Sequence, residues 1–145
     1  MRVVKYLFLI LGILCFAVIA LAQSTKTTTE IFTVGTVRMI RYNWHLYNSS
    51  GVDSCISTKA ISGKVVGLVT VPGEGSSIPS DNWDLEIKDE NGIDILWGLG
   101  ANRDSAATAY IIADSLGYIV QSKLVFLITN GGAYGDSGAI YLYIQ

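Results

Sequence analysis

The chain has 145 residues, of which 50% are hydrophobic and only 15% are charged, and its formal net charge at pH 7 is -2. This length suits a single domain with one core. The weakly acidic charge provides no basic surface of the kind that binds nucleic acid.

The first 22 residues are typical of a secretory signal peptide. Arg2 and Lys5 precede an apolar run that closes on the small residues Ala20 and Ala22. The run is about 16 residues long, which is short of the roughly 20 that cross a bilayer. We therefore expect cleavage before Gln23 and a secreted mature chain, with an uncleaved membrane anchor as the alternative.

Cleavage at this point changes the cysteine content and the charge. It removes Cys15, so Cys55 is the one cysteine of the mature chain. The mature chain then has eight basic and 12 acidic residues. Neither an intrachain disulfide nor a cysteine-based metal site can then form, so the core has to hold the domain together. Cys55 is expected to be a buried or half-buried thiol, and an intermolecular bridge is the alternative.

After the signal peptide, residues 23–30 are polar and rich in threonine, and we expect them to form an extended arm. The folded domain is expected to cover residues 31–145. Its clearest early strand lies over residues 40–46, where apolar side chains alternate with polar ones. Residues 48–51 then make a turn.

The next segments are also rich in strand-forming residues. Residues 55–71 are expected to be mostly β, with Gly63 and Gly67 as bends or bulges. Residues 72–77 form a loop.

A hairpin follows this loop. Trp83, Leu85 and Ile87 alternate with charged residues, which predicts a strand. Asp89 to Gly92 is a turn sequence, after which residues 93–96 are expected to return as the second strand.

The last third of the chain is expected to contain a loop and then a strand within residues 101–116. Two long strands follow, over residues 120–128 and 139–144, joined by the turn-rich residues 130–138. No long helix is predicted.

Roughly six to eight short strands with frequent turns predict an all-β fold, a single antiparallel β-sandwich or jelly-roll-like domain. Tyr141 and Tyr143 lie on the opposite face of the last strand and are expected at the surface or in a subunit contact. The predicted core consists of Ile40, Tyr42, Trp44, Leu46, Val66, Leu68, Trp83, Leu85, Ile87, Leu124, Phe126, Ile128, Ile140, Leu142 and Ile144.

One short motif resembles a catalytic sequence. Gly135 to Gly138 reads Gly-Asp-Ser-Gly, as around the nucleophile of chymotrypsin-like proteases, and His45 and Asp84 would complete the chain order of a triad. We reject this interpretation because His45 lies within a strand and only seven residues follow Gly138, where that fold needs a long C-terminal portion. The motif is interpreted as a turn.

Asp89, Asn91 and Asp94 supply oxygen atoms at a spacing that weakly resembles a calcium loop. A hairpin turn explains the same residues without a metal. With one histidine and no paired acids outside this hairpin, we expect no catalytic residue, no metal and no cofactor, and therefore no enzyme.

Five aromatic residues could instead stack on sugar rings, although core and interface positions are commoner for aromatic residues in a small β domain. They are Trp83, Trp97, Tyr110, Tyr118 and Tyr134. A secreted carbohydrate-binding or adhesin module is therefore the alternative function.

Residues 83–104 carry a family resemblance. They combine an alternating strand, an acidic Asn-Gly hairpin, an Ile-Asp-Ile-Leu return and a Gly-rich segment that ends in Ala-Asn-Arg-Asp. In these features the chain resembles small phage-encoded, virion-associated β-structured proteins of poorly defined role, and residues 123–128 and 137–144 look similar too. The resemblance implies a virion-associated subunit without catalytic residues.

These observations favour an exported, non-enzymatic structural or assembly subunit of a virion or a surface filament. We expect a homo-oligomer or polymer whose subunits join through β-strand edges, at the arm of residues 23–30 and at the strand of residues 139–145. A glycan is the other candidate partner. Neither nucleic acid nor, after cleavage, a membrane is expected.

The signal peptide leads to the first prediction. The native protein should begin at Gln23, because Ala20 and Ala22 form a small-x-small cleavage site. The intact mass of protein from its native source checks this, and a mass that includes residues 1–22 would favour a membrane anchor.

Overall fold

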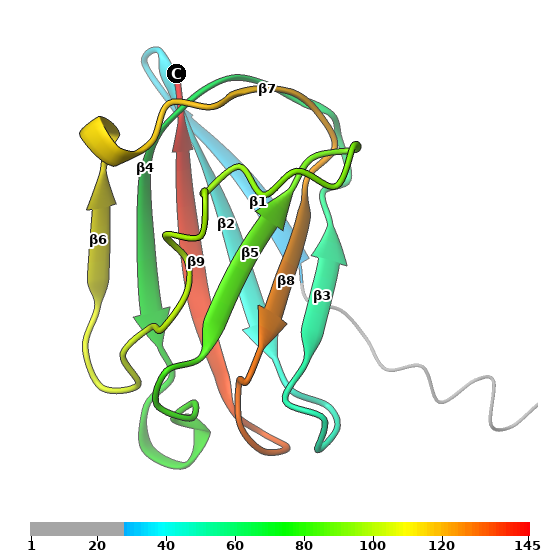
Figure 1. Cartoon of the computed structure of the whole chain (residues 1–145), viewed down its shortest axis with the longest axis vertical. Helices are drawn as coiled ribbons and strands as arrows, with labels where there is room; N and C mark the ends of the chain where they lie inside the picture. Colours follow the sequence, from blue (N-terminus) through cyan, green and yellow to red (C-terminus); the bar gives the residue numbers. More distant parts are fainter. Residues whose placement is uncertain (1–27) are drawn as a thin grey trace, which may run out of the picture.

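The computed structural model describes residues 28–145, so the expected signal peptide and residues 23–27 of the expected arm lie outside the described residues. The described part consists of two antiparallel sheets that face each other (Figure 1). This arrangement confirms the predicted all-β sandwich. Residues 28–145 contain no helix with the length and apolar character needed to span a bilayer.

The larger sheet has its strands in the order β1-β2-β9-β4-β6, and β7 pairs with a further part of β4. The smaller sheet has the order β3-β8-β5 and covers one face of the larger one (Figure 1). The strands are β1 (Thr28–Val34), β2 (Val37–His45), β3 (Asp53–Ile56), β4 (Ile61–Pro72), β5 (Asp84–Lys88), β6 (Ala109–Ile112), β7 (Ile119–Ser122), β8 (Val125–Thr129) and β9 (Ser137–Ile144), with short 3-10 turns η1 (Gly75–Ser77) and η2 (Ala113–Ser115).

The core lies between the sheets and consists of the apolar faces that alternation predicted. Fourteen of the 15 predicted core residues are buried, which confirms the assigned strand faces. Tyr42 packs on Phe126 and Trp44 packs on Trp83 across the two sheets, with ring centroids 4.9 and 5.2 Å apart. The core residues that the sequence did not predict are Ile61, Val65, Ile95, Leu96 and Val120.

Val66 was wrongly assigned to the core. The β4–β9 register shifts between Val65 and Gly67, so a β-bulge lies at this point. The extra residue reverses the alternation, and Val65 is buried while Val66 is only half-buried. The bulge predicted at Gly67 is therefore confirmed, but its effect on the side-chain faces was not anticipated.

The single strand expected over residues 120–128 is also wrong. It is divided into β7, which pairs with β4, and β8, which belongs to the smaller sheet. At the crossing, the Leu124 N–H donates to the Ser57 hydroxyl at 3.0 Å. Because both sheets face the same core, alternate residues stay buried across the change of sheet. The sequence pattern therefore looks like one strand.

The turn predicted at residues 89–92 is confirmed, but the return strand is not. The Gly92 N–H donates to the Asp89 carbonyl at 3.0 Å, and Gly92 has φ +79°. The chain then makes an isolated bridge between Lys88 and Asp94 and continues in turns, and a second isolated bridge joins Trp83 and Arg103. The loop and strand expected within residues 101–116 are confirmed by β6.

The two expected contact segments are placed differently from the prediction. Residues 28–30 of the expected arm are the first part of β1 and pair with residues 41–43. Residues 139–144 lie in β9, which is paired on both sides, with β2 and with β4 (Figure 1). The expectation that this last strand has an open edge is therefore wrong.

The turn generates a stability prediction. Gly92→Val should lower the free energy of unfolding by about 1 kcal/mol or more, because a β-branched residue resists the positive φ at this position. A Cβ at Gly92 would meet nothing within 4 Å, so steric overlap does not contribute. Denaturant unfolding measures the effect. Gly92→Asn is the control and should be nearly neutral, since asparagine tolerates this conformation.

Candidate functional site

The edges of the two sheets are the candidate functional site, because a sheet edge presents unpaired backbone groups to other chains. Among the described residues, the backbone hydrogen bonds of β1 go to β2, and those of β6 go to β4. Neither strand contains lysine or proline, the residues with which many proteins block an edge. The exposed apolar side chains on these strands are Ile31, Phe32, Val34, Tyr110 and Ile112.

The free edge of β5, in contrast, is covered by the chain that follows it. The segment of residues 93–103 runs along this edge and pairs with its backbone. Four hydrogen bonds join residues 83–89 to this segment: Asp89 N–H to Ile93 carbonyl at 3.0 Å, Ile95 N–H to Ile87 carbonyl at 2.8 Å, Leu85 N–H to Gly100 carbonyl at 2.9 Å and Arg103 N–H to Trp83 carbonyl at 2.7 Å. This edge is therefore closed to strand addition.

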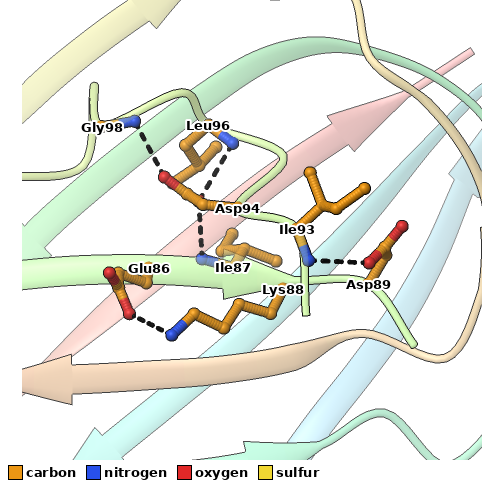
Figure 2. A network of polar contacts seen from close by, with 8 residues as sticks. All are labelled: Glu86, Ile87, Lys88, Asp89, Ile93, Asp94, Leu96 and Gly98. Atoms are coloured by element: carbon orange, nitrogen blue, oxygen red, sulfur yellow. Dashed lines mark hydrogen bonds and ion pairs between the residues drawn. The ribbon is translucent and has the colours of Figure 1, made fainter. Parts of the chain in front are cut away.

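Asp94 completes the cover with its side chain (Figure 2). Its carboxylate accepts from the N–H groups of Ile87 at 3.3 Å, Leu96 at 3.1 Å and Gly98 at 2.8 Å. The first of these bonds replaces the carbonyl that a neighbouring strand would offer to β5. Asp94, which the sequence offered as a possible calcium ligand, is thus a hydrogen-bond acceptor for backbone N–H groups.

Asp89 also accepts hydrogen bonds from backbone N–H groups with its carboxylate. It is buried, and its carboxylate accepts from the N–H groups of Asn91 and Ile93 and from the Tyr118 hydroxyl, each at 2.9 Å. The hydrogen bond from Ile93, with a smaller contribution from Tyr118, lowers the pKa of Asp89. The same contact raises the pKa of Tyr118. Within residues 28–145, no three acidic, histidine or cysteine side chains gather as metal ligands.

The five aromatic residues proposed as a sugar platform do not form one face. Trp83 is fully buried against Trp44, so its assignment to a platform is wrong. Of the five, only Trp97 and Tyr118 are joined by a ring contact in the described chain, with centroids 6.0 Å apart. Tyr110 lies on β6, while Tyr134 lies in the turn between β8 and β9, and both are exposed.

The Gly-Asp-Ser-Gly motif was interpreted as a turn, but only its first half leaves the sheet, since Ser137 and Gly138 are the first two residues of β9. The Asp136 carboxylate accepts from Ala133 N–H at 2.6 Å. His45 lies opposite Ser137 in the β2–β9 register, a proximity that the sequence did not predict. Asp84 lies on the other sheet and accepts from Asn130 Nδ2 at 2.7 Å, so the three residues do not assemble as a triad.

Cys55 lies on β3 and is half-buried, which confirms the expectation from the sequence. Its thiol donates to the Ile56 carbonyl with an Sγ–O distance of 3.6 Å. Burial, and then the nearby charge of Asp53, raise the pKa of the thiol. A raised pKa reduces the thiolate fraction and with it the reactivity of the group.

The sequence matches no family model and no curated protein. Among solved structures, the chain aligns with one from the "Cyanophage Pam1 capsid asymmetric unit" at a TM-score of 0.43 and 14% identity. The alignment covers 85% of this chain and 92% of that chain.

The network around Asp89 predicts a pH dependence. Because folding lowers the pKa of Asp89, its carboxylate stabilises the folded chain above about pH 4, the ordinary pKa of an unfolded aspartate. This contribution is lost as the pH falls through the lowered folded-state pKa. Thermal unfolding followed from pH 6 to pH 2 should therefore show a smaller loss of stability for Asp89→Asn than for the wild type. The exposed Asp114, changed to Asn, should behave as the wild type does.

Proposed function

We propose that this chain is a non-enzymatic assembly subunit whose copies join through the open edges of β1 and β6. The contrast between edges carries the proposal. The chain uses a whole segment and the Asp94 side chain to close the edge of β5, yet two apolar edges of the larger sheet have no such cover among the described residues.

The positions of these edges suit assembly. β1 and β6 are the two ends of the order β1-β2-β9-β4-β6, so the larger sheet can gain a strand on either side (Figure 1). Each backbone hydrogen bond made there contributes about 0.5–1.5 kcal/mol net. A neighbouring copy that pairs along β1 would form several such bonds.

The outer face of the larger sheet adds side-chain contacts beside the β1 edge. Phe32 and Val34 are 45% and 78% exposed. Phe32 lies opposite Met39, which lies opposite Tyr143 on β9, so apolar side chains continue across three strands of this face. A partner strand at β1 could therefore bury apolar surface as well as form hydrogen bonds.

Two observations support the kind of assembly. The polar side chains considered for chemistry, Asp89 and Asp94, bind backbone groups and so hold the fold. Residues 83–104, which resemble phage-encoded structural proteins, are β5 and the segment that covers its edge. A building block of a virion or of a surface filament is the form we propose, and export through residues 1–22 is part of this proposal.

Edge substitutions test the proposal. Val34→Lys on β1 and Ile112→Lys on β6 each place a charge at an exposed edge position, 78% and 68% exposed, respectively. At least one of them should prevent assembly while leaving the melting temperature nearly unchanged, because lysine blocks strand addition. Sedimentation velocity and electron microscopy of the mature chain, residues 23–145, report the size of the assemblies.

Ile93→Lys is the matched control. Ile93 is 45% exposed, but it lies in the segment that already covers the edge of β5, so this variant should assemble as the wild type does. A wild-type mature chain that stays monomeric at high concentration would overturn the proposal. Normal assembly of both edge variants would do the same.

A further inference from the structure

A hollow of about 470 Å³ lies at the end of the larger sheet where β2, β4 and β9 meet. His45, Ser137 and Ala139 alternate with the buried residues of β2 and β9, so the hollow lies on the face of the larger sheet that points away from the smaller one. Its polar and aromatic lining comes from β2, from β9 and from the chain just beyond β2 and β4. This lining includes Asn43, His45, Tyr47, Glu74, Ser137 and Ala139.

Small residues in the lining let the chain beyond β4 pack closely against β9. The backbone of Gly73 approaches β9 closely, and its N–H donates to the Ser137 carbonyl at 2.9 Å. A Cβ on Gly73 would lie 2.3 Å from the Ser77 carbonyl oxygen and 2.8 Å from the Ser137 oxygens, so a larger residue does not fit there. Ala139 adds only a methyl group to the floor.

His45 and Tyr47 form an aromatic wall. Alternation along the chain places both on the same face as Asn43. The two rings lie 4.4 Å apart at an angle of 38°. His45 packs against the ring of Tyr47. Tyr47 is still 42% exposed and can therefore contact a ligand.

The burial of one His45 nitrogen determines which hydrogen-bonding group the ring offers. Nδ1 is buried and has no hydrogen-bond partner among the described residues. A proton on Nδ1 would be a buried N–H without an acceptor among the described residues, so we assign the proton to Nε2. The Nε2–H group is then the donor that this ring, which lines the hollow, can offer to a ligand.

The other polar groups have complementary roles. The Asn43 Oδ1 atom already accepts from Arg41 Nε at 2.9 Å, which leaves the Asn43 NH₂ group as a donor. Ser137 offers a hydroxyl, and Glu74 offers a carboxylate that can accept. The lining contains no lysine or arginine, so a phosphate or carboxylate ligand would find no opposite charge.

An aromatic ring, separate donors and acceptors, and the absence of a cation suit a neutral ligand with many hydroxyl groups and one apolar face. We propose that this hollow, the His45–Tyr47 groove, binds a neutral saccharide ring. The residues differ from those that the sequence indicated for sugar binding, and the proposal is independent of assembly through β1 and β6.

A glycan array that carries terminal hexoses, deoxyhexoses and N-acetylhexosamines is the first test of the mature chain. The methyl glycoside of the sugar that binds is then titrated into the protein. Because the chain has one histidine, the imidazole proton resonances in the NMR spectrum belong to His45, and they should shift on binding. Tyr47→Ala should weaken binding about tenfold or more, and Tyr47→Phe should retain most of it.

Two further variants separate the groove from other surfaces. Ala139→Leu fills the hollow without removing a polar group and should abolish binding. Trp97→Ala removes an exposed aromatic ring from the segment that covers β5, outside the groove and the open edges, and should bind as the wild type does. Thermal unfolding verifies that each variant is folded. The absence of any array signal from the wild type, or unchanged binding by a folded Ala139→Leu variant, would overturn the proposal.

Discussion

The pairing of β9 between β2 and β4 is the constraint on which the rest of the structure depends. Ile40 of β2 lies opposite Leu142, and Leu142 in turn lies opposite Leu68 of β4, so three distant parts of the chain form one buried row. Without β9, the larger sheet would divide into two pieces with new open edges. Its central position moves the open edges outward to β1 and β6.

The edge of β5 differs from the two ends of the larger sheet. At β5 the chain supplies a covering segment, and Asp94 accepts three backbone N–H groups that would otherwise need other partners. β1 and β6 have no such covering segment among the described residues, and they carry exposed apolar side chains. An edge of this kind favours strand addition.

The His45–Tyr47 groove depends on the same strand pairing. β9 brings Ser137 opposite His45, and the close approach of Gly73 brings the end of β4 against β9. The groove therefore combines three segments that are distant in the sequence, around residues 43–47, 71–74 and 137–139. The open edges and the groove thus lie on different parts of one sheet.

The sequence by itself determined the strand faces, since alternation in residues 40–46 and 83–87 depends only on the local period of a strand. It also determined the turn at Gly92, which needs only local backbone geometry. Only the tertiary structure decided which strands are edges, because hydrogen bonding between strands is non-local. Hence β9 proved central, and residues 120–128 proved to span two sheets. The bulge beside Gly67 places Val65 in the core instead of Val66 for a related reason, because the register of a strand depends on its partner strand.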